Sequence, residues 1–286
     1  MGAITTLAKR VNRLAKDTRE HHEQALDGGV MAILPSNQRL ADRLSGVLGV
    51  PVADRTMVDL LLIPLGIEDD GRAVALEVAA RSRQGQRTLV VVVCADHDRA
   101  RRERELLGQP DVTIGDLLFT PDVESDEAVR LINAGLIRAL GHGMVPAARR
   151  YPALRDPVRR HLVDVAARES AIAGALNWFS GSAAAQHAMV VRMGSAEGQG
   201  LNAKRIPEVA IATATGLAVA YVARGASRIV PAPRWMVRGA VAWASTVALA
   251  TAAERLSRQM GDVENIDVKD AAKTFIRATL RRKGKS

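Results

Sequence analysis

The sequence predicts two parts, an α/β domain built on a parallel sheet and an all-α module that contains a helical hairpin. Between residues 28 and 143, short apolar runs alternate with helical patterns, which is typical of parallel strands covered by helices. Beyond residue 160 the strand patterns stop. Two Ala-rich runs without a charged residue follow at residues 209–223 and 239–253, and they predict two helices of small residues joined as a hairpin.

Composition restricts the function before any motif does. The chain has 40 Lys and Arg against 31 Asp and Glu, a formal net charge of +9. This excess indicates either an acidic partner, such as nucleic acid or anionic lipid, or a solvated basic surface. Its single cysteine, Cys94, excludes an internal disulfide and fits the reducing cytoplasm. The first residues lack the apolar core of a signal peptide, so we expect a cytoplasmic protein.

Both ends of the chain are expected to form basic amphipathic helices. At residues 1–27, apolar side chains recur every three or four positions, and most cations lie off that stripe. At residues 262–286, cations recur every four positions along one side of a predicted helix. We take these cations as candidate contacts with a protein partner or an anionic membrane surface. They are Lys9, Arg13, Lys16, Lys269, Lys273, Arg277 and Arg281.

The α/β domain is expected to hold four strands, each followed by a helix. Ser36 is predicted to cap the first helix, and the pairs Asp69-Asp70 and Asp122-Glu124 are predicted to supply capping carboxylates. The strand patterns lie at residues 30–34, 58–65, 88–95 and 112–120. The helical patterns contain Leu40, Leu44 and Leu48 in the first case and cover residues 73–83, 98–107 and 126–140 in the others.

The ends of these strands, where such sheets bind ligands, lack the residues that hold phosphate. The turn at residues 35–39 has neither the glycines nor the lysine of a phosphate-binding loop. Leu65-Gly66 lacks an Asp for magnesium, and the third strand is followed by Asp96 without a guanine-reading motif. We therefore expect no nucleotide and no other cofactor. The alternative is a divergent nucleotide-dependent switch that uses residues 35–39 and Asp96 as a reduced site.

The second half of the chain is expected to be helical after a connector rich in Arg and Pro at residues 144–160. Pro157 fits the first turn of a helix that runs to about Phe179. A second helix is predicted at residues 183–193. The helical module with its hairpin then extends over residues 161–261.

The hairpin allows two interpretations, a buried core or a pair of membrane spans. Each run has 15 residues without a charge, whereas a spanning helix needs about 20. Arginines follow or precede both runs closely, so spanning requires them to reach the interface. Small residues recur every four positions, at Ala212, Gly216 and Ala220 and at Ala244, Ala248 and Ala252. Such rows let helix backbones approach closely in either setting, and they also allow self-association.

Several stretches of the second half carry a family resemblance. They are Gln186-His187-Ala188-Met189-Val190, Asn202-Ala203-Lys204-Arg205-Ile206-Pro207-Glu208, Ile229-Val230-Pro231, Trp235-Met236-Val237 and Gly239-Ala240-Val241-Ala242. On these, residues 169–256 resemble the bacterial domain-of-unknown-function family 697. The chain departs from its usual pattern at Met193-Gly194. The resemblance implies an all-helical module behind a Rossmann-like, degenerate GTPase-like domain without nucleotide motifs, and it carries no catalytic residue across.

No catalytic or metal-binding constellation is predicted. Cys94, His97 and Asp98 are close in sequence near a strand end, but they are three ligands of mixed type with no second cluster. Asp164 and Arg168 are four residues apart, as in a surface ion pair. No zinc finger, DNA-binding helix pair or aromatic stacking sheet appears, so nucleic-acid binding is the weaker alternative. We expect an uncharacterised, non-enzymatic docking or scaffold protein, associated with a partner or with the inner membrane surface.

Overall fold

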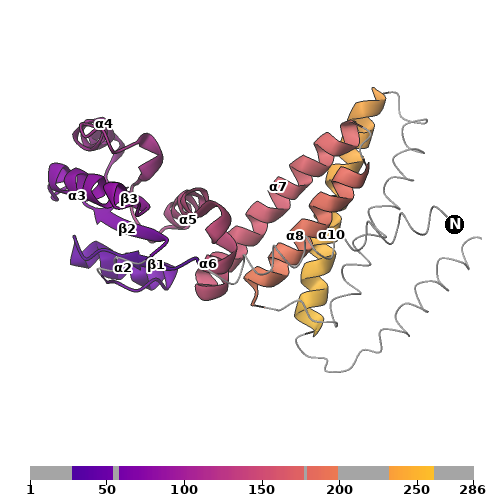
Figure 1. Cartoon of the computed structure of the whole chain (residues 1–286), viewed down its shortest axis with the longest axis horizontal. Coiled ribbons are helices and arrows are strands. Elements are labelled where there is room, and N and C mark those ends of the chain that lie inside the picture. Colours follow the sequence, from indigo (N-terminus) through magenta and orange to yellow (C-terminus); the bar gives the residue numbers. More distant parts are fainter. Residues whose placement is uncertain (1–27, 54–57, 177–178, 199–231, 261–286) are drawn as a thin grey trace, which may run out of the picture. The chain divides into compact units, whose positions relative to one another are not determined.

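The computed structural model describes residues 28–53, 58–176, 179–198 and 232–260 (Figure 1). These residues divide into two compact units. The α/β unit holds residues 28–161 with 195–198, and the helical unit holds residues 162–194 with 232–260. Each unit is described by itself below.

The α/β unit is built on a four-stranded sheet. Strands β1 (Met31–Ile33), β2 (Leu60–Leu65), β3 (Thr88–Val93) and β4 (Leu117–Thr120) lie side by side in chain order, and every neighbouring pair is parallel. Nearly every strand residue is buried, which explains the continuous apolar runs because both faces of a parallel sheet are covered. The prediction of a parallel α/β domain is confirmed.

The fourth strand is shorter than predicted. Residues Ile114–Asp116 form a 3-10 turn instead of strand. The carboxylate of Asp116 accepts hydrogen bonds from the backbone N–H of Thr113 at 2.9 Å and from its hydroxyl at 2.7 Å. This side-chain capping gives the backbone an alternative to strand pairing, and so the prediction of strand from residue 112 was wrong.

Helices cover both faces of the sheet. Helices α3 (Gly71–Arg83) and α4 (Asp96–Leu106) contact each other on one face, where the buried cluster includes Ala32, Leu61, Ile63, Val74, Val78, Val90, Val92 and Leu106. Helix α5 (Asp126–Leu140) lies on the other face, because Gly135 sits against the side chain of Leu118. Helix α2 (Gln38–Leu48) contacts β1, β2 and the turn η3 (Pro152–Leu154).

The stretch predicted as a connector is folded into this unit. After the turn η2 (Gly141–Gly143), it forms helix α6 (Met144–Arg150), η3 and the beginning of α7 (Arg155–Ala175). The Tyr151 hydroxyl accepts from the Met31 N–H at 2.9 Å and donates to the Met31 carbonyl at 3.0 Å. The Ile33 N–H donates to the Pro51 carbonyl, and the Ile33 carbonyl accepts from the Ala53 N–H, each at 3.0 Å. The outer edge of β1 is therefore paired, which protects it from pairing with another strand.

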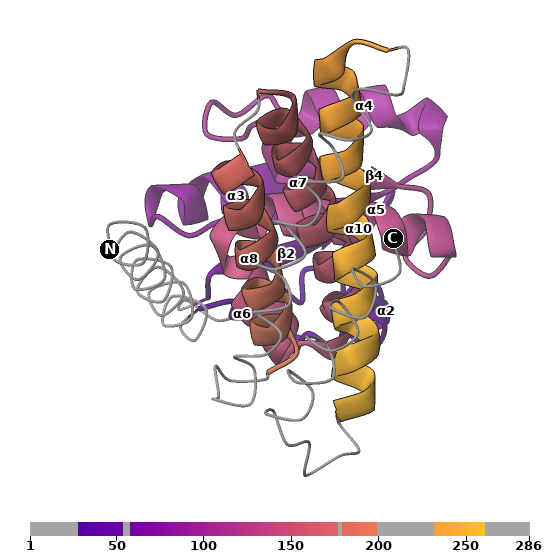
Figure 2. The ribbon, with the colours of Figure 1, turned by 90° about the vertical axis from the view of Figure 1, so that its right-hand side faces the viewer.

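The helical unit consists, among the described residues, of α7 (Arg155–Ala175) from Leu162 onward, α8 (Phe179–Ala196) and α10 (Arg234–Met260). Figure 2 shows these three helices alongside one another. Pro157 lies in the first turn of α7, as predicted. The backbones of α7 and α10 approach closely at Gly174 and Gly239: a Cβ at Gly239 would lie 3.1 Å from the Ala171 carbonyl oxygen.

The row of α10 that meets α7 and α8 differs from the one that the sequence singled out. Gly239, Ala242 and Thr246 are buried, whereas Ala244 and Ala248 are exposed. None of the described helices is both long and apolar enough to cross a membrane. The run at residues 239–253 falls within α10, and the run at residues 209–223 lies outside the described residues.

Candidate functional site

The carboxyl edge of the sheet is where a ligand of an α/β fold is expected. Four loops meet this edge, one after each strand: β1–α2, β2–α3, β3–α4 and β4–α5. The donors and acceptors of each loop, taken in turn, show what this edge can bind.

The β1–α2 turn is closed by hydrogen bonds of Asn37 and Ser36. Asn37 caps α2, because its Oδ1 accepts from the Leu40 N–H at 3.1 Å. Its Nδ2 donates to both carboxylate oxygens of Asp69, at 3.1 and 2.8 Å. The Ser36 hydroxyl donates to the Pro64 carbonyl at 3.0 Å. The prediction that Ser36 caps α2 was therefore wrong by one residue, because the Ser36 side chain is directed to β2.

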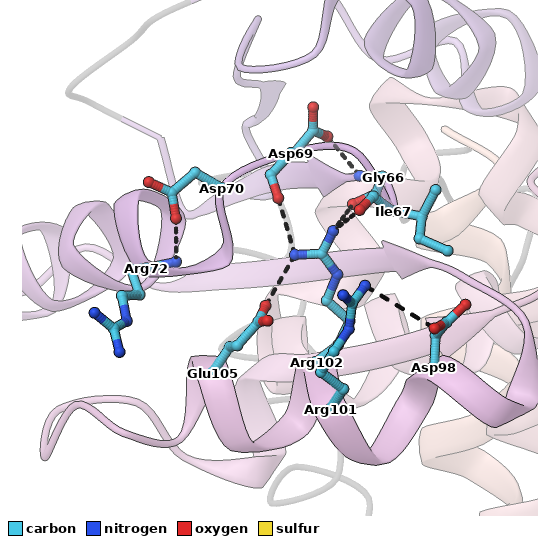
Figure 3. A network of polar contacts seen from close by, with 9 residues as sticks. All are labelled: Gly66, Ile67, Asp69, Asp70, Arg72, Asp98, Arg101, Arg102 and Glu105. Carbon is cyan, nitrogen blue, oxygen red and sulfur yellow. Dashed lines mark hydrogen bonds and ion pairs between the residues drawn. The ribbon is translucent and has the colours of Figure 1, made fainter.

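The β2–α3 loop is held by one buried arginine, Arg102 of α4 (Figure 3). Its guanidinium donates to three backbone carbonyls of the loop, those of Gly66 and Asp69 at 2.9 Å and that of Ile67. It also pairs with Glu105 at 2.9 Å. The Arg102 side chain is only 4% exposed, and its Nε has no acceptor. Three carbonyls on one cation fix the course of this loop.

The two aspartates of this loop have different roles. Asp70 caps α3 by accepting from the Arg72 N–H at 2.9 Å, as predicted. Asp69 does not cap the helix; its carboxylate accepts from the Gly66 N–H at 2.5 Å and from Asn37. Asp69 thus joins two neighbouring loops of the edge.

The β3–α4 loop brings Cys94, His97 and Asp98 near one another without forming a reactive site. Cys94 is 8% exposed, and burial raises the pKa of its thiol, which keeps it protonated and weakly nucleophilic at neutral pH. His97 is 81% exposed at the side chain and lies 3.2 Å from the Asp98 carboxylate. Within the described ranges, no group of three or more His, Cys, Asp or Glu side chains could hold a metal ion.

The β4–α5 loop is organised by Asp122. Its Oδ1 accepts from the N–H groups of Glu124 at 2.8 Å and Ser125 at 2.7 Å, and the Ser125 N–H is the main cause of its lowered pKa. Ser125 caps α5, so the prediction that Asp122 and Glu124 cap this helix was wrong. Glu124 pairs with Arg43 of α2 at 2.8 Å, which lowers the Glu124 pKa.

The edge carries charges of both signs. Carboxylates of Asp69, Asp122 and Glu124 stand in its loops, and the first turns of α2, α3 and α4 carry Arg39, Arg72 and Arg99. Arg102 is already bound to carbonyls. A phosphate needs free N–H groups and uncommitted cations. Among the loop groups described above, the Asn37 amide and the Arg102 guanidinium are committed to acceptors within the protein.

Sequence reasoning missed Arg102, the residue at the centre of the hydrogen bonds drawn in Figure 3. It lies among five arginines and glutamates of α4, and nothing in the local pattern separates it from its exposed neighbours. The ion pair of Asp164 with Arg168 is confirmed, at 2.7 Å. The candidate contact residues lie outside the described residues: Lys9, Arg13, Lys16, Lys269, Lys273, Arg277 and Arg281.

The fold defines a parallel α/β unit joined to a unit of helices. Comparisons of the chain with models of known protein families, with curated proteins and with solved structures found no match. The resemblance of residues 169–256 to domain-of-unknown-function family 697 therefore stays a prediction.

Proposed function

We propose that this chain is a non-enzymatic docking or scaffold protein of the cytoplasm. Its α/β unit is a platform without nucleotide, and its basic ends bind an anionic surface, on a protein partner or on the inner face of the membrane. The observation that carries the proposal is the hydrogen bonding of the carboxyl edge. There the Asn37 amide donates to the Asp69 carboxylate, which also accepts from the Gly66 N–H, and Arg102 donates to the Gly66 carbonyl. These groups therefore bond the protein instead of presenting donors to a ligand.

The loop after β1 is the position that would have to bind phosphate in a nucleotide switch. No glycine stands between Leu34 and Asn37, and the Asn37 amide is committed to the Asp69 carboxylate. A carboxylate at that point repels phosphate. This supports a platform that does not bind nucleotide.

The strand order bears on the same question. Doubly wound nucleotide-binding sheets have a point where the strand order reverses and a crevice opens. The described strands run in chain order from β1 to β4, so this crevice is not formed by them. A platform needs no crevice, which favours the docking proposal over the divergent switch.

The charge distribution supports an anionic partner. The chain carries a net +9. Seven of its cations recur at helical spacing in the two terminal segments. Clusters of this kind bind anionic lipid or acidic protein surfaces through long-range attraction.

Calorimetric titration of the full chain with GTP and with ATP, each with magnesium, tests the platform. We expect no saturable heat. Saturable binding that is lost in an Arg39→Glu, Asp96→Ala double variant would contradict the proposal and support the divergent switch, in which residues 35–39 and Asp96 form the site.

Sedimentation with vesicles tests the docking surface. The full chain is expected to sediment with vesicles containing phosphatidylserine and not with neutral vesicles. Reversing Lys9, Arg13 and Lys16 to Glu should weaken sedimentation strongly, as should reversing Lys269, Lys273, Arg277 and Arg281. A matched control reverses three exposed arginines of the α/β unit, Arg39, Arg72 and Arg104.

The control separates net charge from position. If the Arg39, Arg72 and Arg104 variant loses as much binding as the terminal variants, the basic ends are not the docking surface. If the unaltered chain binds neither vesicle but is retained by an acidic protein partner through the same terminal residues, the partner is a protein. Shift of random DNA at moderate salt would instead support the nucleic-acid alternative.

A further inference from the structure

Arginines crowd the corner between α6 and α7, at residues 149–160. This stretch holds five arginines and one carboxylate, that of Asp156. Helix α4, of similar length, holds four arginines and four carboxylates. The arginines are therefore balanced by acidic residues in α4 but not at this corner. We call its exposed arginines the arginine corner and define it as Arg149, Arg150, Arg155 and Arg160.

Buried side chains hold the backbone of this corner on the α/β unit. Tyr151 is 5% exposed, and Leu154 and Val158 are 0% exposed. The Tyr151 hydroxyl bonds both backbone groups of Met31 in β1. The Tyr151 N–H donates to the Ala147 carbonyl at 2.7 Å, and the Leu154 N–H donates to the Tyr151 carbonyl at 3.0 Å. Because these side chains fill the inner side, the arginines between them are left on the outer surface of a fixed backbone.

The arginine corner lacks acidic partners. Within the part of the chain that the structure describes, none of its four side chains forms an ion pair, and Asp156 pairs with Arg159 at 2.9 Å. By contrast, the exposed Arg83 pairs with Asp111 at 3.0 Å. Even with Glu197, whose neighbour Gly198 lies beside Arg149, the area keeps an excess of cations. Such an excess repels itself, and a bound anion relieves that repulsion.

Helix stability explains only part of this arrangement. A cation stabilises a helix near its C-terminus and destabilises it near its N-terminus. Arg149 and Arg150 lie in the last turn of α6, where they are favourable. Arg155 is the first residue of α7, so it adds a positive charge to the positive end of that helix, where Asp156 is paired with Arg159. An anion bound there interacts favourably with both the side chain and the helix end.

We propose that the arginine corner binds the headgroups of anionic lipids and holds the α/β unit on the membrane surface. The inference rests on the proposed docking function and adds a contact within the folded unit to the basic ends. Clusters of about four or more Lys and Arg are attracted to anionic lipid. Arginine suits phosphate headgroups because its planar guanidinium donates two parallel hydrogen bonds.

The uncharged tip of the corner favours lipid over nucleic acid. Pro152 and Ala153 are exposed between Arg150 and Arg155, so the tip can lie at the level of the headgroups with arginines around it. Single-stranded nucleic acid binds by stacking on exposed aromatic rings. The only aromatic residue of residues 149–160 is Tyr151, and its ring is buried with its hydroxyl bonded to β1. Duplex DNA is the competing partner in the test.

Removing charge at the corner tests the proposal. In the full chain, three arginines of the corner are changed together to Gln: Arg149, Arg150 and Arg155. The apparent Kd for vesicles containing phosphatidylserine should rise about tenfold or more, with circular dichroism and thermal unfolding unchanged. The matched control removes the same charge from three other exposed arginines of the unit, Arg39, Arg72 and Arg104, and should raise the Kd less than about threefold. Equal losses in the two variants overturn the proposal.

Comparison with the terminal charge reversals separates this inference from the docking function. If the terminal variants lose vesicle binding and the corner variant keeps it, the basic ends dock alone and the inference fails. If only the corner variant loses binding, the inference stands and the basic ends are not the docking surface. An unaltered chain that binds no vesicle, or a corner variant that loses only the shift of duplex DNA, overturns the lipid assignment and leaves docking on a protein partner to its own test.

A label at the tip locates the contact independently of affinity. In a Cys94→Ala background, Ala153→Cys carries an environment-sensitive fluorophore, and saturating vesicles with phosphatidylserine are added. Its emission should shift to shorter wavelength, because the dye enters a less polar layer. The same label on Leu76→Cys in α3 is the reference, since Leu76 is 56% exposed, and its emission should not shift. No shift at Ala153→Cys, or equal shifts at both positions, would contradict the proposal.

Discussion

Leu61, Ile63, Val90 and Val92 of the α/β unit are each 0% exposed, and these large side chains fill the space between the sheet and its helices. In the helical unit the backbones meet directly: a Cβ at Gly174 would lie 2.8 Å from the Ala242 Cβ and 2.9 Å from the Arg238 carbonyl oxygen. The first unit is therefore filled by side-chain volume. The second depends on the absence of side chains at a few contacts.

The two units also bury different polar groups. In the α/β unit a buried cation, Arg102, bonds the carbonyls of a loop. In the helical unit neutral groups, Gln186 and Thr246, bond across two helices. The comparison indicates that loops at the sheet edge are fixed by charge-assisted bonds, while helices are positioned by close approach. Variants that affect the stability of one unit and leave the other unchanged would test this difference.

The largest effect is expected from Arg102→Ala. It removes the donors to the Gly66, Ile67 and Asp69 carbonyls and leaves Glu105 without its cation, which we expect to lower the free energy of unfolding of the α/β unit by about 3 kcal/mol. Urea denaturation with hydrogen exchange would assign the loss to one unit.

The control for this variant is Arg101→Ala, which changes the neighbouring residue. Arg101 is 57% exposed and lies 3.9 Å from Asp98, so its loss should change stability by less than about 0.5 kcal/mol. Similar losses in the two variants would show that Arg102 is not what holds the loop.

The second largest effect is expected from a Gly→Ala substitution, which is made once in each unit. Gly174→Ala forces a Cβ against the Arg238 carbonyl and should destabilise the helical unit by about 2 kcal/mol. Gly46→Ala in α2 meets nothing within 4 Å and should stabilise the α/β unit by about 0.5 to 1 kcal/mol, because alanine is the better helix former. Thermal unfolding measures both. An increase in thermal stability for both variants would contradict the close approach of α7 and α10.

A smaller loss is expected from Tyr151→Phe. The variant keeps the ring but removes the hydroxyl that bonds both backbone groups of Met31. Two buried backbone groups lose a partner, and we expect a loss of about 1.5 kcal/mol. Ser36→Ala removes a bond of similar length at an exposed side chain and should have little effect. Amide exchange of Met31 should accelerate in the first variant only.

The smallest effect concerns Asp122 and pH. Its pKa is lowered in the folded protein by the N–H groups of Ser125 and Glu124. The stabilisation is therefore complete above the unfolded pKa and is lost as pH falls through the folded pKa, below about pH 4. Urea midpoints measured between neutral and acid pH should decline less steeply in Asp122→Asn. An unchanged slope would mean that Asp122 does not organise this loop.

Local signals in the sequence predicted much of the α/β unit. The predicted helix at residues 126–140 coincides with α5, because Ser125 and two acidic residues mark its start and Gly141 its end. The strand at residue 112 failed because Thr113 and Asp116 bond each other. The same short stretch is compatible with a strand and with a capped 3-10 turn, and tertiary contacts decide which of the two forms.

The connector and the edge show where local signals end. Prolines and arginines at residues 144–160 predicted a solvated link, but Val145, Ala147 and Leu154 are buried there. Arg102 has the same sequence surroundings as the exposed Arg101 and Arg104. Burial of a charged side chain depends on which carbonyls lie opposite it, and these come from a loop more than thirty residues earlier in the chain.

The sequence by itself determined the alternation of strands and helices, the apolar runs that become the parallel sheet, and the uncharged run that becomes α10. Each follows from periodicity and capping, which act over a few residues. The tertiary structure alone decided the strand order, the burial of Arg102, the closure of the β1–α2 turn by Asp69, and the side of α10 that meets α7. These depend on contacts between residues far apart in the chain, because packing and hydrogen-bond satisfaction are settled in space.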